Sequence, residues 1–107
     1  HRIISGDVPE SLARKKLARP RALARVVEPT SGRVMEVFTD QPGVQFYTSI
    51  HMTEVKGRGG AVYRTNQALC LETQHFPDTP NKPNFPSTVL RPGKTFRSTT
   101  IHRFSTQ

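Results

Sequence analysis

The stretch RVMEVFTDQPGVQFYTS, residues 33–49, decides the fold class of this chain. Its first part alternates, so that Val34, Glu36 and Phe38 fall on one side of an extended strand over residues 33–39. The tetrapeptide Asp-Gln-Pro-Gly then supplies a turn with Pro-Gly at its centre, and residues 44–49 favour a second strand. Two short strands joined by a tight turn predict antiparallel pairing.

The same pattern continues on both sides of this stretch. Residues 22–27 favour a strand that pairs with residues 33–39 across the Gly-containing turn at 28–32. We therefore predict an all-β fold with antiparallel strands. Further strands are expected at 61–63, 68–73 and 95–104, with a flexible Lys-Gly-Arg-Gly-Gly loop at 56–60 and a Pro-Gly turn at 91–94.

A proline-rich segment interrupts this pattern. Four of the nine prolines lie in FPDTPNKPNFP, residues 76–86. Proline has no N–H for a sheet ladder, so this segment is not a central strand. We expect a long ordered loop, stiffened by fixed backbone angles and anchored by Phe76 and Phe85. Loops of this length inside a domain are usually functional.

Composition limits the possible classes of protein. The chain has 107 residues, one cysteine and 16 basic against 8 acidic residues, which gives a net charge of +8. No apolar run approaches the roughly 20 residues that a membrane helix needs. One cysteine forms no internal disulfide, and a reducing, cytoplasmic setting is expected. The excess charge is local, because residues 1–25 hold seven basic and two acidic residues.

The basic N-terminal segment, residues 1–21, favours either a loop insertion or a short helix. Helix propensity is highest over residues 9–19, between Pro9 and Pro20. A nucleic-acid-binding arm over residues 12–25 is the functional alternative, and a solvated loop or frayed helix is the structural one. Since no aromatic residue is interleaved to stack on bases, we expect neither a nucleic-acid nor a membrane partner.

Glu72 is the one chemically suggestive residue found by pattern alone. It follows the apolar run 68–71 and precedes the proline-rich loop, so one hypothesis is that the loop covers the carboxylate and partly buries it. Burial raises the pKa of a carboxyl group toward values useful to a general base. A salt-bridged surface glutamate is the alternative. The histidines at 1, 51, 75 and 102 lack a spacing that places two on one helix face, so no metal site is expected.

Four blocks resemble the aldose 1-epimerases, also called galactose mutarotases. PGVQFYT at 42–48 is similar to a strand of that family, and CLETQHFPD at 70–78 with PNFP at 83–86 resembles its second signature. Two further blocks are SGRVMEV at 31–37 and LRPGKT at 90–95. They occur in the family's order and together cover about residues 22–105.

The resemblance implies a fold and a reaction. Residues 22–107 are expected to form the C-terminal part of a β-supersandwich domain that interconverts the α and β anomers of hexoses such as galactose and glucose. By the family's pattern, Glu72 is the catalytic general base and Gln45 binds the sugar. No cofactor or metal is implied.

The resemblance also implies what this chain lacks. In the family, the acid histidine that protonates the ring oxygen lies upstream, and His51, His75 and His102 do not match it. The chain is therefore expected to be a fragment that bears the base without the acid. Its partners would be the hexose and the missing N-terminal part of the same fold. The alternative is a non-catalytic carbohydrate-binding remnant.

Overall fold

The computed structural model describes residues 2–5 and 20–107, with side chains described from residue 20 onward. Within these residues the secondary structure consists of eight strands and two short 3₁₀ turns. Every pair of neighbouring strands is antiparallel. The predicted all-β class with antiparallel strands is confirmed. Within the segment 1–21, for which a loop insertion or short helix is predicted, residues Arg2–Ser5 form a strand, and the helix expected over residues 9–19 lies outside the described residues.

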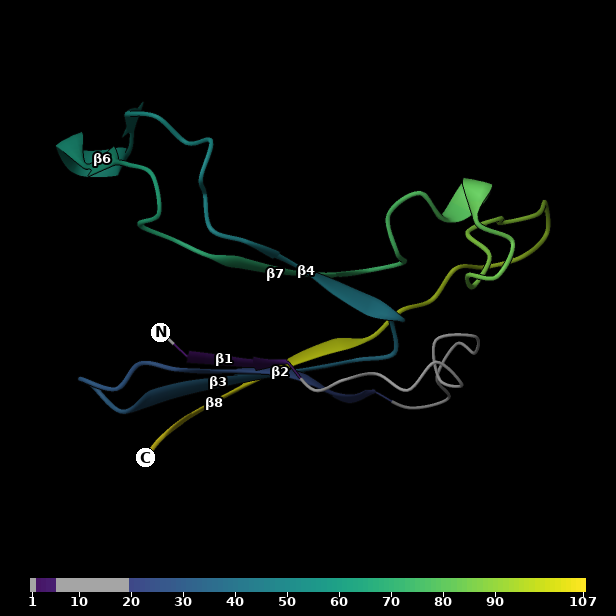
Figure 1. The fold of residues 1–107 in the computed structure, drawn as a ribbon, viewed down its shortest axis with the longest axis horizontal. Helices are drawn as coiled ribbons and strands as arrows, with labels where there is room; N and C mark the ends of the chain where they lie inside the picture. Colours follow the sequence, from purple (N-terminus) through teal and green to yellow (C-terminus); the bar gives the residue numbers. More distant parts are fainter. Residues whose placement is uncertain (1, 6–19) are drawn as a thin grey trace.

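The largest element is a four-stranded sheet in the order β1-β2-β3-β8, drawn in the lower half of Figure 1. The start of β1 and the end of β8 lie at the same end of this sheet, as the pairing register requires. The four strands are β1 (Arg2–Ser5), β2 (Arg21–Val27), β3 (Arg33–Thr39) and β8 (Thr100–Thr106).

Two smaller sheets complete the structure. The β4·β7 ribbon crosses over the four-stranded sheet, and the β5·β6 hairpin extends from one end of that ribbon (Figure 1). At the other end, the chain continues into the proline-rich loop. The elements are β4 (Gly43–Tyr47), β5 (Val55–Lys56), the 3₁₀ turn η1 (Arg58–Gly60), β6 (Val62–Tyr63), β7 (Cys70–Gln74) and η2 (Thr79–Asn81).

The alternation predicted in β3 is borne out by its contacts with β8. The Arg103 guanidinium lies 4.7 Å from the centre of the Phe38 ring and pairs with the Glu36 carboxylate at 3.8 Å. Phe38 and Glu36 therefore share one face, as expected for residues two apart in a strand. The opposite face carries the most buried residues, because Val37 and Thr39 both have 0% of their surface exposed.

The strands differ from the prediction at several places: β5 was not predicted, β6 and β7 begin later than expected, and the ends of β4 and β8 differ for reasons that the contacts show. β4 stops at Tyr47 instead of residue 49, since Ser49 adopts a left-handed backbone with φ of 57°. Its hydroxyl donates to the Ala68 carbonyl at 3.3 Å. β8 begins at Thr100 instead of residue 95, because Ser98 and Thr99 bond to a side chain in the β3–β4 turn.

That β3–β4 turn is held by the Asp40 carboxylate. One of its oxygens accepts hydrogen bonds from the Ser98 hydroxyl at 2.9 Å and the Thr99 N–H at 3.1 Å. The Gln41 amide also donates to Ser98 at 2.6 Å. Gln41 is buried, and hydrogen bonds replace water for its Nε2 and N–H groups, whereas its Oε1 has no hydrogen-bond partner among the described residues. The turn and the segment before β8 thus form one hydrogen-bonded unit.

Thr100 links the four-stranded sheet to the β4·β7 ribbon. Its hydroxyl shares hydrogen bonds with the Thr39 hydroxyl at 3.1 Å and the Thr73 hydroxyl at 2.8 Å. Thr39 lies in β3 and Thr73 in β7, so one side chain joins both sheets. The Thr39 oxygen also accepts from the Gln41 N–H at 3.1 Å.

A second carboxylate shapes the β2–β3 turn. Glu28 accepts hydrogen bonds from the N–H groups of Thr30 at 2.9 Å and Ser31 at 2.7 Å. The turn closes at Gly32, whose φ of 69° is in the left-handed region that glycine adopts without steric cost. Hydrogen bonds from the Ser31 side chain and from the Thr30 and Ser31 N–H groups lower the pKa of Glu28 to about 2.

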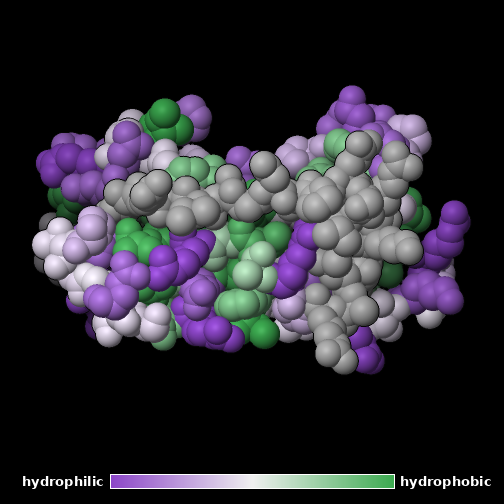
Figure 2. Space-filling view, turned by 60° about the horizontal axis from the view of Figure 1, so that its bottom comes forward, coloured by the Kyte–Doolittle hydropathy of each residue, from purple (hydrophilic) through white to green (hydrophobic). Residues whose placement is uncertain are grey.

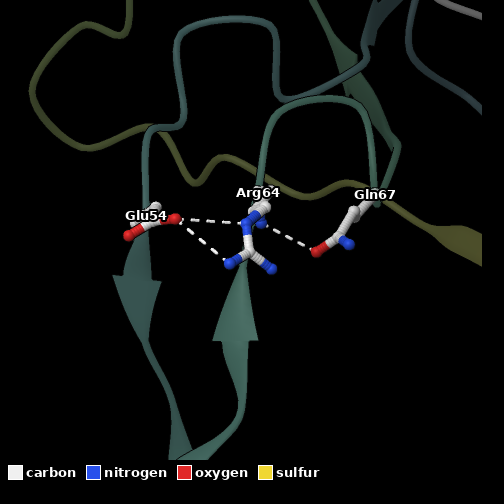
Figure 3. A network of polar contacts seen from close by, with 3 residues as sticks. All are labelled: Glu54, Arg64 and Gln67. Carbon is white, nitrogen blue, oxygen red and sulfur yellow. Dashed lines mark hydrogen bonds and ion pairs between the residues drawn. The ribbon is translucent and has the colours of Figure 1, made fainter.

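The β5·β6 hairpin is closed at its base by polar contacts (Figure 3). The Arg64 guanidinium bonds the Glu54 carboxylate at 3.1 and 3.2 Å, and the Arg64 N–H donates to the Gln67 side chain at 2.7 Å. At the tip, Gly59 and Gly60 have φ of 66° and 80°, so the expected Gly-rich loop is a tight turn. The ion pair between Arg64 and Glu54 is exposed to solvent and therefore contributes little to stability.

Apolar side chains remain at the surface on several elements. Figure 2, which turns the side of the four-stranded sheet forward, shows apolar residues between hydrophilic ones. Among the described residues, only Ala24, Val34 and Val37 are buried hydrophobics. The exposed large apolar residues are Phe46, Ile50, Val55, Tyr63, Val89, Leu90, Phe96, Ile101 and Phe104.

Replacing Thr100 by Val is expected to lower the free energy of unfolding by about 1–2 kcal/mol, because it leaves the Thr39 and Thr73 hydroxyls without their shared partner. Urea unfolding followed by circular dichroism measures the change. Thr100→Ser is the matched control, since it keeps the hydroxyl and should lose less. Equal stability of the Val and Ser variants would contradict this account.

Glu28 should titrate with a midpoint near 2 in an NMR pH titration, well below its ordinary value of 4.5. Because the folded-state pKa is lowered, its contribution to stability is present above about pH 4.5 and is lost as the pH falls toward 2. The unfolding free energy of Glu28→Gln should lack this pH-dependent part. A Glu28 midpoint above 4 would show that the turn bonds are not formed.

Candidate active site

The β4·β7 ribbon places the two predicted site residues opposite each other. Gln45 of β4 and Glu72 of β7 are direct partners in the antiparallel register. Directly opposed residues have Cβ atoms about 4.5–5.5 Å apart on the same face of a sheet. The predicted base and the predicted sugar-binding amide are thus brought side by side, although 27 positions separate them in the sequence.

This face of the ribbon points away from the four-stranded sheet. Thr73, next to Glu72, bonds Thr100 of that sheet, and successive side chains of a strand point to opposite faces. Gln45 and Glu72 therefore face outward, and both are exposed. The hypothesis that the proline-rich loop covers Glu72 does not hold for the described structure, because Glu72 is exposed and the loop packs at Gly43, beyond the end of β7.

The loop is anchored on Gly43, at the start of β4. A Cβ atom at this position would lie 2.9 Å from two carbons of the Phe76 ring, closer than real contacts allow. Glycine therefore lets the Phe76 ring lie against the strand backbone. Phe76 in turn packs on Phe85 in an edge-to-face contact with ring centres 5.1 Å apart. The predicted anchoring by Phe76 and Phe85 is confirmed.

Internal hydrogen bonds fix the shape of the loop between these two rings. Asp78 has a left-handed backbone with φ of 62°, and its carboxylate accepts from the Asn81 amide and pairs with Lys82 at 3.5 Å. Thr79 is buried, and its hydroxyl and N–H both donate to the Phe76 carbonyl. The loop is therefore an ordered unit next to the Gln45–Glu72 pair.

The described part of the chain shows neither a metal-binding cluster nor a helix that could span a membrane. Residues 20–107 hold no group of three or more His, Cys, Asp or Glu side chains arranged to bind a metal ion. No helix among the described residues is long and apolar enough to span a bilayer. Cys70, two residues before Glu72 on the same face, is exposed and forms no disulfide.

Comparison with known families bears on these observations. The aldose 1-epimerase family profile matches residues 3–103 of the chain. The chain belongs to the aldose 1-epimerase family. The match includes β4, β7 and the proline-rich loop, so the resemblance stated from the sequence blocks is confirmed.

Curated members of the aldose 1-epimerase family match over most of the chain. A galactose mutarotase of Mus musculus is 48% identical over 92 residues, which cover 85% of this chain and 27% of the relative. The Homo sapiens galactose mutarotase is 52% identical over 83 residues, which cover 77% of this chain and 24% of the relative. An aldose 1-epimerase of Escherichia coli is 36% identical over 72 residues, which cover 65% of this chain and 21% of the relative. The chain spans about a quarter of the length of these relatives.

Replacing Gly43 by Ala should displace the Phe76 ring and lower the free energy of unfolding by about 1–3 kcal/mol, as overpacking does. Urea unfolding measures the loss, and the aromatic NMR signals of Phe76 and Phe85 should shift with it. In a Phe76→Val background, which removes the two clashing ring carbons, the same substitution should cost less than half as much. An equal cost in both backgrounds would contradict the proposed role of Gly43.

Proposed function

We propose that this chain supplies the general-base side of an aldose 1-epimerase active site, which interconverts the α and β anomers of hexoses. The observation that carries the proposal is the direct pairing of Gln45 with Glu72 across β4 and β7. Membership of the family supports it, as do relatives named galactose mutarotase and aldose 1-epimerase.

In this proposal, the Glu72 carboxylate takes the proton from the hydroxyl on C1 of the sugar. An acid donates a proton to the ring oxygen, the bond between C1 and the ring oxygen breaks, and the open-chain aldehyde results. Rotation about C1–C2 and the reverse proton transfers then close the ring as the other anomer. One proton leaves the C1 hydroxyl and one reaches the ring oxygen, so the proposed ring opening changes no oxidation state and uses no redox partner. General-base catalysis of this kind contributes typically about 10²- to 10⁴-fold in rate.

Gln45 is proposed to orient the sugar beside the base. An amide both donates and accepts hydrogen bonds, as a sugar hydroxyl does. In the structure, the Gln45 Nε2 has only a long contact of 3.4 Å with the neighbouring Phe46 carbonyl. This amide can therefore exchange its present contact for a sugar hydroxyl at little cost.

The acid is proposed to come from the rest of the family fold, either in a longer form of this chain or as a separate polypeptide. The chain spans about a quarter of its relatives, and large apolar side chains such as Leu90, Phe96 and Phe104 are exposed. The number of large apolar side chains at the surface is in keeping with further polypeptide that covers them. We further propose a cytoplasmic setting, in keeping with the single, unpaired Cys70.

A non-catalytic carbohydrate-binding role is the second candidate. It is favoured by the exposure of Glu72, because the described structure gives this carboxylate no enclosing wall. The carbohydrate-binding role and the enzymatic role differ in whether the protein accelerates the exchange of anomers. A binding remnant would take up hexose without accelerating anomer exchange, whereas the proposed enzyme requires Glu72 for a measurable rate.

A chimaeric protein tests the proposal. The matching quarter of the Homo sapiens galactose mutarotase is replaced by this chain, and mutarotation of fresh α-D-glucose is followed by polarimetry. The chimaera should be active, and Glu72→Gln in it should lower kcat by at least about 100-fold. The 107-residue chain alone should stay at the buffer rate.

Two results would overturn the proposal. One is a folded chimaera with no activity, which would favour the carbohydrate-binding role. The other is a Glu72→Gln chimaera as active as its parent, which would remove Glu72 as the base. Gln67→Leu serves as the matched control, because Gln67 lies at the β5·β6 hairpin and not on the ribbon (Figure 3).

A further inference from the structure

A small hollow lies beside the Gln45–Glu72 pair at the end of the ribbon. It has a volume of about 70 Å³ and is lined by residues that include Gly43, Gln45, Gln74, His75 and Phe76. Two of the lining residues, Gln45 and Gln74, carry side-chain amides, and Phe76 is aromatic. Ligand sites typically combine apolar walls with a few such polar groups. None of the sequence blocks assigned a role to Gln74.

The register places Gln74 on the same face as the proposed site. Gln74 follows Glu72 by two positions in β7, and side chains two apart share a face. Because Gln45 is the direct partner of Glu72, Gln74 is the diagonal neighbour of Gln45 on that face. Diagonal neighbours lie about 7–8 Å apart, within reach of long side chains. The carboxylate thus has one amide across from it and another along its own strand.

The hollow exists because the partner of Gln74 is a glycine. Gln74 pairs with Gly43, which puts no side chain on this face. The Phe76 ring occupies part of the freed space, near the Gly43 backbone, and leaves the remainder open beside Gln74. The residues that line the hollow thus include the aromatic Phe76 and the two glutamines, Gln45 and Gln74.

The polar groups that face the hollow have few partners within the described protein. The Gln74 side chain forms no hydrogen bond with any described residue, although Gln74 is half-buried, and the Gln45 amide has the single long contact noted above. Half-buried amides normally find protein or water partners. An amide without a protein partner beside a proposed sugar site is available for a ligand hydroxyl.

We propose that Gln74 is a further hexose-binding residue, which holds a ring hydroxyl in the hollow while Glu72 acts at C1. The inference rests on the proposed function, because it takes the Gln45–Glu72 face as the sugar site. The ligand class is a pyranose, with an apolar C–H face for Phe76 and hydroxyls that both donate and accept. Gln74 contributes to affinity, and the proton transfers remain with Glu72.

The 107-residue chain itself is the test object. The chain labelled with ¹⁵N is titrated with D-galactose, and the side-chain amide signals of Gln45, Gln74 and Gln67 are followed by NMR. Glycerol at matched hydroxyl concentration is the control solute. The Gln45 and Gln74 signals should shift saturably with galactose, while Gln67 and all glycerol spectra should not.

Variants then measure the contribution of the amide. Gln74→Leu keeps the side-chain size and should raise the Kd for galactose about fivefold to tenfold, the value of one hydrogen bond. Gln67→Leu is the matched control and should stay within about twofold of the parent chain. Urea unfolding of both variants checks that the fold is kept.

Each outcome decides the inference. If galactose binds and shifts Gln45 but Gln74→Leu binds as tightly as the parent, Gln74 is not a binding residue, and the proposed function is untouched. If galactose produces no shift beyond that of glycerol, the inference is overturned for this chain. The proposed function itself stands or fails with the Glu72→Gln chimaera, so the two results are separable.

Discussion

The hydroxyl of Thr100 is the point on which the arrangement of this chain depends. It bonds Thr39 in β3 and Thr73 in β7, and so fixes the β4·β7 ribbon against the four-stranded sheet. Thr73 adjoins Glu72, and alternation along β7 then forces the carboxylate to the opposite face. The direction in which the proposed base points is therefore set by a neutral hydroxyl on another strand, and not by any charge at the site.

Local sequence was sufficient for the strands but not for their ends. Period-two alternation and Gly- or Pro-containing turns correctly predicted the segments around β2, β3, β4 and β8, because both signals act within a few residues. The end of β4 depends on a contact from Ser49 to Ala68, and the start of β8 on the Asp40 carboxylate. Such contacts join positions tens of residues apart, so no local pattern could reveal them.

The candidate site shows the same division. The sequence pattern alone marks Glu72, the family resemblance adds Gln45, and only the register shows that the two residues are opposed. Gln74 could have been found from sequence, since it lies two positions after Glu72 and must share its face in a strand. The hollow beside Gln74 depends on its pairing with Gly43, and this pairing is known only from the register of β4 and β7. Of the two alternatives for Glu72, the structure shows the exposed one, because the loop is anchored by Phe76 to Gly43, beyond the end of β7.

The geometry of the ribbon also limits where the proposed acid must stand. The four-stranded sheet lies behind Thr73, so a sugar beside Glu72 has the ribbon on one side and open space on the other. Proton transfer to the ring oxygen requires a donor within hydrogen-bond distance of that atom. In the proposed enzyme, the outward face of β4 and β7 carries Glu72, so the acid is expected on the open side of the sugar, opposite the ribbon.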